Sequence, residues 1–108
     1  MNGNPQTENI LLGFGSNIGD GPGNLRIALR AAERAGIRIR RLSSIYFSSP
    51  VGPQDQNRFT NAVALAETVL SPEGLLIVCK SVELELGRDF GEKRWGPRVI
   101  DIDILLYG

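Results

Sequence analysis

The chain has 108 residues, about the length of one domain, and its twelve basic and twelve acidic residues give a formal net charge of zero. A balanced charge gives no argument for binding nucleic acid or an anionic membrane surface. There is no histidine and only one cysteine, Cys79. These counts exclude, within this chain, a Ser-His-Asp triad, a histidine general base, a histidine zinc site and an internal disulfide. Any catalysis must use carboxylates, guanidinium groups, backbone amides or a metal ion held by oxygen ligands.

The beginning of the chain is polar and lacks the basic and then apolar pattern of a secretory signal. We expect residues 1–8 to be a disordered tail and residues 9–108 to form a single domain. No apolar run approaches the ~20 residues that a membrane span needs. The sequence therefore predicts a cytoplasmic protein without a membrane partner.

The first half of the chain predicts a strand, a helix and a second strand. Residues 9–14 are a short apolar run, and the turn formers after them predict a loop. From Asn24 the apolar residues recur at helical spacing, and Gly36 marks the expected end of that helix. Residues 37–47 read as one long strand, in which the alternation slips near Arg41 and indicates a bulge or bend.

The second half predicts a strand, a helix and a last strand, separated by two loops. Residues 48–56 contain two prolines and a glycine and predict an exposed loop, after which residues 59–69 are strand-like. Ser71-Pro72-Glu73 is typical of a helix start, with a hydroxyl N-cap, proline at N1 and an acid in the first turn. That helix is expected to end at Gly87, before a loop over 88–98 and a strand over 99–107.

The order strand, helix, strand, strand, helix, strand predicts the α+β class. With right-handed crossovers it gives a ferredoxin-like βαββαβ fold, a four-stranded antiparallel sheet with both helices on one face.

The last strand carries two acidic residues on one face. Its alternation predicts Ile100, Ile102, Ile104 and Leu106 beneath the helices and places Val99, Asp101, Asp103 and Leu105 on the opposite face. Two carboxylates about 6.6 Å apart along a strand suit Mg²⁺, and a pair of them suits two ions bridging phosphate oxygens. The simpler alternative is two solvated acids on the open face of a one-sided sheet.

The loop before this strand adds positive charge to the argument. Arg88, Lys93, Arg94 and Arg98 precede the two acids, and cations that bind phosphate beside acids that bind metal are the two halves of a phosphoryl-transfer site. The alternative is a solvated basic turn. Trp95 could stack on a planar ligand or equally close the edge of the core. The glycines at 13, 15 and 19 match no phosphate-binding fingerprint and indicate a turn before a helix.

The segment Arg94-Trp95-Gly96-Pro97-Arg98-Val99-Ile100-Asp101-Ile102-Asp103-Ile104-Leu105 resembles the signature of the 6-hydroxymethyl-7,8-dihydropterin pyrophosphokinase family of folate biosynthesis. Three further segments resemble the family in the same order. They are Phe14-Gly15-Ser16-Asn17, then Val51-Gly52-Pro53-Gln54-Asp55-Gln56 with Phe59 and Asn61, and finally Glu83 with Gly87-Arg88.

The resemblance implies an enzyme that transfers pyrophosphate from ATP, the co-substrate, to the hydroxymethyl group of 6-hydroxymethyl-7,8-dihydropterin and releases AMP. It implies that Asp101 and Asp103 hold two Mg²⁺ ions and act in catalysis together with Arg88 and Arg98. The implied pterin site comprises Ser48, Ser49, Val51, Phe59, Asn61 and Trp95. The implied nucleotide site comprises Glu83, Arg88, Arg94, Trp95 and Arg98. The loops over 48–58 and 88–98 are implied to be lids that close on the substrates.

The chain also departs from the family pattern. Phe90 stands where many members have arginine, and Lys80 stands where glutamine is usual. Members continue past the last strand, so a second hypothesis is a truncated or impaired relative that binds pterin or a protein partner without turnover. An RNA-binding module would require aromatic residues on the open face of the sheet, and the sequence offers only Phe59 and Tyr107. We expect a monomer, with pairing through the exposed last strand as the route to a dimer.

Overall fold

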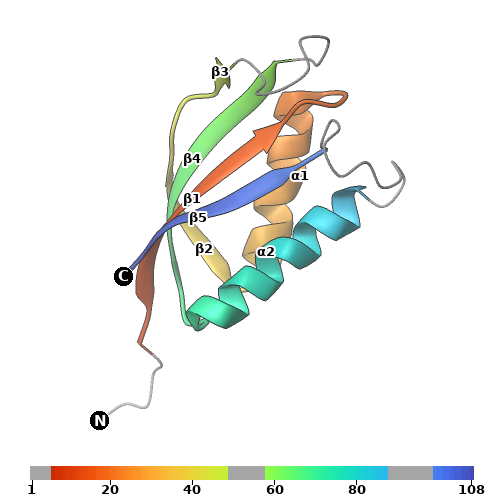
Figure 1. The fold of residues 1–108 in the computed structure, drawn as a ribbon. Coiled ribbons are helices and arrows are strands. Elements are labelled where there is room, and N and C mark those ends of the chain that lie inside the picture. The colour runs from red at the N-terminus through yellow and green to blue at the C-terminus, as the bar shows by residue number, and fades with distance from the viewer. Residues whose placement is uncertain (1–5, 49–57, 88–98) are drawn as a thin grey trace.

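The computed structural model describes residues 6–48, 58–87 and 99–108. These residues form two helices and an antiparallel sheet, which confirms the predicted α+β class (Figure 1). Five strands are present among them, not the expected four. In chain order the elements are β1 (Glu8–Ser16), α1 (Gly21–Arg34), β2 (Ile37–Leu42), β3 (Tyr46–Ser48), β4 (Phe59–Thr68), α2 (Pro72–Gly87) and β5 (Asp101–Tyr107).

The strand count differs because the expected long strand over 37–47 is broken into β2 and β3. Both pieces pair with β4, and the sheet order is β2-β4-β1-β5. The register slips between Ile39 and Arg41, where the sequence predicted a bulge. After β2 the Ser43 side chain takes part in the pairing: the Val63 amide donates to Ser43 Oγ at 2.8 Å, and the Ser43 amide donates to the Val63 carbonyl at 2.8 Å. A side-chain oxygen that competes for a ladder amide in this way interrupts regular strand pairing.

Helix α1 begins three residues before the predicted start at Asn24. Asp20 is its N-cap, with the carboxylate accepting from the Gly23 amide at 3.1 Å, and proline occupies the first turn. The helix ends at Arg34, and Gly36 follows with φ of 103°, a left-handed conformation that favours glycine.

Helix α2 starts as its sequence predicts. Ser71 Oγ accepts from the Gly74 amide at 3.0 Å, and Glu73 lies in the first turn. Its predicted buried face is confirmed, with Leu75, Cys79 and Val82 each no more than 4% exposed. Among the described residues, neither helix has the length and apolar character needed to cross a bilayer.

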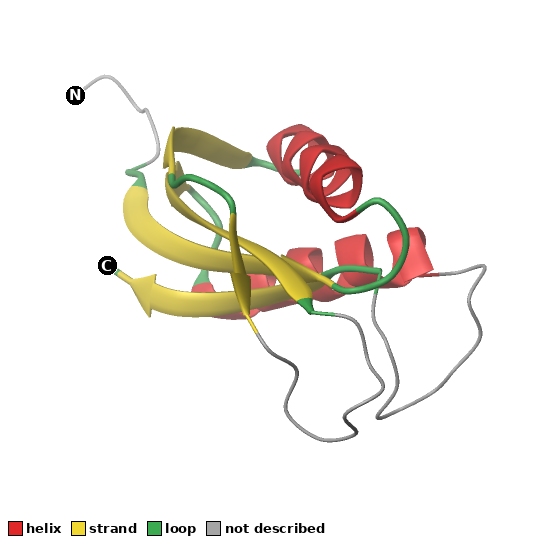
Figure 2. Cartoon of the chain, turned by 90° about the horizontal axis from the view of Figure 1, so that it is seen from above, coloured by secondary structure: helices red, strands yellow, loops and turns green. Residues whose placement is uncertain are grey.

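The two helices form a second layer beside the sheet, and one hydrophobic core lies between the layers (Figures 1 and 2). Alternate residues of the two central strands enter this core and are at most 2% exposed. Burial of such a contiguous apolar set is the main stabilising contribution to a fold of this size. From β1 and β4 the core takes Ile10, Leu12, Phe14, Ala62, Ala64 and Ala66.

Strand β5 has a bulge that the sequence did not predict. Leu11 pairs with Leu106, whereas Leu12 pairs with Ile104, so Leu105 is the extra residue. Beyond it the alternation is reversed, and the expectation that Leu106 lies beneath the helices is wrong: its side chain is 63% exposed. Tyr107 instead packs against the core, and its hydroxyl donates to the Leu70 carbonyl at 2.6 Å.

Candidate functional site

The two acidic residues of β5 lie on the open face of the sheet. Ile102, between them, is 5% exposed and belongs to the core, so Asp101 and Asp103 point the other way. Asp101 is half-buried and Asp103 is exposed. The bulge lies beyond Ile104 and leaves this pair on one face. This placement agrees with the sequence prediction and leaves both carboxylates accessible to a ligand.

The strand next to this pair has no side chains opposite the acids. In the register of β1 and β5, Gly15 pairs with Asp101 and Gly13 pairs with Asp103. Both glycines lie inside β1, so the interpretation of Gly15 as part of a turn before the helix is wrong. Glycine in a strand costs stability but permits close approach of a neighbouring group or a ligand. At the positions paired with the two carboxylates, β1 therefore carries no side chain of its own, and Gly15 is buried by side chains of a neighbouring strand.

A polar and aromatic cluster lies on the other side of β1. Asn61 pairs with Gly15 in the register of β1 and β4, and its amide donates to Ser48 Oγ at 2.8 Å and to the Phe59 carbonyl at 3.2 Å. A β-carbon on Gly15 would lie 3.2 Å from Asn61 Oδ1 and 3.3 Å from Phe59 Cδ1. The Phe59 ring and the Asn61 amide thus reach over Gly15 towards β5. Three of the predicted pterin residues, Ser48, Phe59 and Asn61, are brought together here.

Glu83 reaches the same strand from α2. Its Oε2 accepts from the Ile102 amide at 2.7 Å, and its Oε1 lies 3.4 Å from Lys80 Nζ. The Glu83 side chain is 11% exposed. This carboxylate therefore contacts the backbone between the two aspartates.

The donor set of this site suits a hard cation. Asp101 and Asp103 offer carboxylate oxygens, and no group of three or more His, Cys, Asp or Glu side chains able to hold a metal occurs in the described part of the chain. Mg²⁺ is commonly held by one or two carboxylates, with water and substrate phosphate oxygens completing its octahedral shell. Two accessible carboxylates fit that pattern, whereas they are too few for a closed protein site.

Burial and negative charge together raise the pKa of the Cys79 thiol to about 11. Burial is the larger cause, and the charges of Glu83 and Asp103 add to it, against the lowering effect of Lys80. The thiol is 1% exposed and therefore serves as a core residue rather than as a nucleophile.

The family model of 7,8-dihydro-6-hydroxymethylpterin-pyrophosphokinase matches residues 11–108. The chain belongs to this family. It is 50% identical over 97 residues to the 2-amino-4-hydroxy-6-hydroxymethyldihydropteridine pyrophosphokinase of Methylorubrum extorquens, covering 89% of this chain and 61% of that protein. The enzyme of the same name from Pseudomonas aeruginosa is 42% identical over 102 residues, covering 94% and 62%. The mitochondrial folate synthesis bifunctional protein of Pisum sativum is 43% identical over 103 residues, covering 95% and 20%.

The chain thus spans about three fifths of the length of these bacterial pyrophosphokinases and a fifth of the bifunctional plant protein. The family match confirms the resemblance drawn from the signature. It covers β1 from Leu11 onward, both helices and the acidic pair of β5.

Part of the predicted pyrophosphokinase site lies outside the described residues. The two loops expected to act as lids, over 48–58 and 88–98, fall there almost entirely, as does Phe90. The predicted site residues concerned are Ser49, Val51, Arg88, Arg94, Trp95 and Arg98.

The structure brings the predicted acidic pair and part of the predicted pterin cluster onto one face of the sheet, but the sequence reasoning missed what Gly13 and Gly15 do. The alternation of residues 10–16 already contained this signal, because Gly13 and Gly15 alternate along the strand with apolar residues of the expected core. Glycine at successive outward positions of a strand indicates that a group of a neighbouring strand, or a ligand, approaches its backbone closely.

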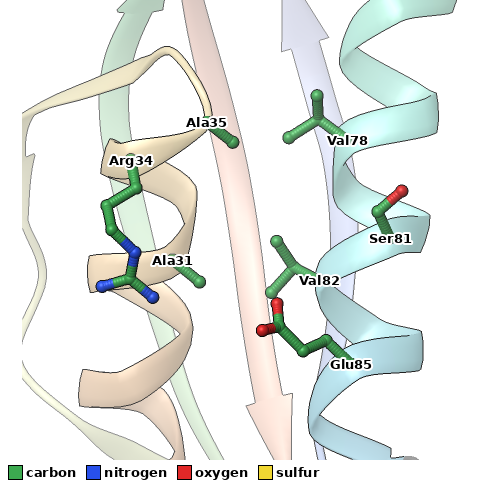
Figure 3. A pocket seen from close by; sticks show the side chains of 7 residues that line it. All are labelled: Ala31, Arg34, Ala35, Val78, Ser81, Val82 and Glu85. Atoms are coloured by element: carbon green, nitrogen blue, oxygen red, sulfur yellow. The ribbon is translucent and has the colours of Figure 1, made fainter.

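A hollow of about 260 Å³ lies elsewhere, between the two helices (Figure 3). None of the residues singled out for chemistry lines it, so it is separate from the candidate pyrophosphokinase site. Arg34 and Glu85 stand on opposite helices beside it. The lining residues are Ala31, Arg34, Ala35, Val78, Ser81, Val82 and Glu85.

Proposed function

We propose that this protein transfers pyrophosphate from ATP to the hydroxymethyl group of 6-hydroxymethyl-7,8-dihydropterin, a step of folate synthesis. The observation that carries the proposal is the arrangement on the open face of the sheet. Asp101 and Asp103 lie on one side of the two glycines of β1, and the Phe59 and Asn61 cluster of β4 lies on the other. In a member of the pyrophosphokinase family, acids suited to metal-bound phosphates on the same face as groups suited to a flat, polar ring support this reaction.

Asp101 and Asp103 would hold Mg²⁺, and the carboxylate pair is compatible with two ions that each also bind phosphate oxygens. When bound, Mg²⁺ would neutralise charge on the transferred pyrophosphoryl group and orient its oxygens. The two aspartates are short and stand on a strand, so few rotamers must be frozen to form the site.

Phe59 and Asn61 would bind the pterin. An aromatic ring offers a stacking face to a flat heterocycle, and a side-chain amide offers both a donor and an acceptor to its edge. The Asn61 amide nitrogen already donates to Ser48 and to the Phe59 carbonyl, which fixes the direction in which its oxygen points. Ser48 would therefore act at the pterin site by orienting Asn61.

The remaining roles complete the proposal. Arg88 and Arg98 would contact phosphates, Arg94 and Trp95 would contribute to the nucleotide site, and Trp95, Ser49 and Val51 would contribute to the pterin pocket. Guanidinium groups pair with phosphate oxygens in bidentate geometry, which suits these arginines to that role. We also expect a monomer that binds no nucleic acid.

A second candidate is a relative that binds pterin without turnover. It rests on the Phe59 and Asn61 cluster alone, which can offer a ring face and an amide to a pterin without the two aspartates. This candidate keeps the Phe59 and Asn61 site but not the reaction.

The test is to follow AMP formation with ATP, Mg²⁺ and the reduced pterin, for the native chain and for Asp101→Ala and Asp103→Ala. Removal of either carboxylate is expected to lower kcat by about 100-fold or more, the scale on which loss of one preorganised charge-stabilising group acts. Calorimetric titration with the pterin and an ATP analogue separates the two candidates. Pterin binding without AMP formation supports the second, and turnover that survives both substitutions rejects the role of the aspartates.

A further inference from the structure

We propose that Glu83 is a positioning residue that holds the acidic segment of β5 in place through the Ile102 amide. Its catalytic consequence rests on the proposed function, because it acts on the strand that carries Asp101 and Asp103. The resemblance to the family implied a nucleotide contact for Glu83 instead. The contacts of its carboxylate favour the positioning role.

The first argument is the place of β5 at the edge of the sheet. It is the last strand in the order β2-β4-β1-β5 and has β1 as its partner. Amides of successive residues in a strand point to opposite sides, so every second one on an edge strand faces away from the ladder. Ile102 is such a residue, since its amide donates to Glu83 Oε2 rather than to β1. Glu83 thus supplies the partner that a further strand would otherwise provide.

The second argument is the quality of this contact. The nitrogen of Ile102 and Oε2 of Glu83 are 2.7 Å apart, at the short end for an amide donor and typical of a charged acceptor. The Glu83 side chain is 11% exposed, so water competes little for it. Lys80 Nζ lies 3.4 Å from the other carboxylate oxygen and restricts the carboxylate further. Both oxygens therefore have partners within the protein.

The third argument is position along the strand. The Ile102 amide belongs to the peptide unit that follows Asp101, and the next peptide unit leads into Asp103. A displacement of this short segment would move both carboxylates at once. Groups that orient metal ligands without contacting the metal typically change metal affinity or activity by about 10- to 100-fold when they are removed. Glu83 can have an effect of that kind without touching metal or substrate.

The experiment compares Glu83→Ala with Glu83→Gln. Glutamine keeps a carbonyl oxygen for the Ile102 amide and removes the charge, whereas alanine removes the acceptor. Hydrogen exchange at Ile102, measured by NMR with the Leu12 amide as an internal reference for global opening, reports the strand directly. The concentration of Mg²⁺ at half-maximal activity reports the site. The matched control is Glu85→Ala, which removes an exposed carboxylate two residues further along α2.

We expect Glu83→Ala to speed exchange at Ile102 by at least about tenfold while exchange at Leu12 is unchanged. The Mg²⁺ requirement should rise about 10- to 100-fold in the same variant. Glu83→Gln should lie within about threefold of the native chain in both measurements, and Glu85→Ala should match the native chain. A merely structural role would change exchange at Ile102 and Leu12 together.

Two results would overturn the proposal. In the first, Glu83→Gln raises the Mg²⁺ requirement as much as Glu83→Ala does, and hydrogen exchange at the Ile102 amide stays slow in both variants. Glu83 would then act through its charge on the metal or the nucleotide. If alanine leaves Ile102 exchange unchanged, Glu83 does not hold the strand. The exchange measurement needs no turnover, so an inactive native chain would count against the proposed reaction alone. In that case the two variants are compared through the Mg²⁺ concentration that half-saturates binding of an ATP analogue.

Discussion

The two faces of the sheet are built from the same strands, but β1 contributes large apolar side chains to one face and glycines to the other. On the helix side, Leu12 and Phe14 are 0% and 2% exposed and pack into a continuous core. On the open side, the residues that alternate with them are Gly13 and Gly15, which present no side chains. On the covered face β1 supplies the side chains that fill the space, whereas the space over its two glycines is occupied by side chains of the neighbouring strands β4 and β5.

The difference shows how a chain of 108 residues can carry both a core and a site. Because a strand directs successive side chains to opposite faces, stability and ligand binding are encoded by alternate positions. Substitutions on the covered face should therefore act on unfolding, and those on the open face should act on binding.

The largest expected effect is loss of a core side chain. Leu12→Ala should lower the free energy of unfolding by about 2–5 kcal/mol, because Leu12 is 0% exposed and its removal leaves a cavity. The matched substitution on the open face is Leu65→Ala, at a leucine that is 41% exposed. Leu65→Ala should lower the free energy of unfolding by less than about 1 kcal/mol, because folding removes less of the Leu65 side chain from water.

Urea unfolding followed by circular dichroism measures both variants of this pair. Equal losses for Leu12→Ala and Leu65→Ala would mean that the open face is as well packed as the covered one, and the comparison would fail.

The next effect is a loss of stability at high pH that depends on Cys79. Its thiol has a pKa of about 11 in the folded chain, against 9.0 for an unperturbed thiol. Between these pH values the unfolded chain releases the proton while the folded chain keeps it, so stability falls as pH rises. The loss approaches about 3 kcal/mol, at 1.36 kcal/mol per pKa unit.

Cys79→Ala provides the control, because lysines and tyrosines titrate in both chains and only the thiol differs. Urea midpoints are compared at pH 8 and pH 11. We expect the native chain to lose more stability than the variant over that interval. Parallel losses would show that water reaches the thiol and that the covered face is less dry than its burial indicates.

Much of the covered face was predictable from local sequence patterns. The apolar alternation of residues 10–14, the Ser71 cap and the apolar face of α2 each determine structure through neighbours a few residues away. The bulge at Leu105 was not predictable, because it is a matter of register between β1 and β5, and register depends on the partner strand. The break between β2 and β3 also depends on a partner strand, because it involves the contact of Ser43 with Val63 of β4.

The site was predicted unevenly for a related reason. Asp101 and Asp103 could be placed on one face from spacing alone, and the structure agrees. Glu83 could not be connected to Ile102, because the two are 19 residues apart and meet only when α2 packs against β5. The role of Gly15 likewise becomes clear only when Phe59 and Asn61 of β4 are seen to pack over it.

The smallest expected effect tests the close packing over β1 with two glycines on the same strand. Neither Gly13 nor Gly15 has a positive φ, so alanine is allowed at both positions. A β-carbon at Gly15 would lie 3.2 Å from Asn61 Oδ1 and 3.3 Å from Phe59 Cδ1, which forces these groups to shift by a few tenths of an ångström. At Gly13 the nearest atom would be Leu105 Cδ1 at 3.5 Å, an ordinary contact.

Gly15→Ala should therefore weaken pterin binding by about tenfold, or about 1.4 kcal/mol, because it displaces both groups proposed to hold the ring. Gly13→Ala should leave pterin binding within about twofold and raise stability by about 0.4–1 kcal/mol, since alanine restricts the unfolded chain. Calorimetric titration with the pterin and urea unfolding measure the pair. Equal effects on binding would mean that the pterin does not depend on the Phe59 and Asn61 geometry. Weaker pterin binding in Gly13→Ala alone would indicate that the ring lies near Leu105 rather than near the cluster on β4.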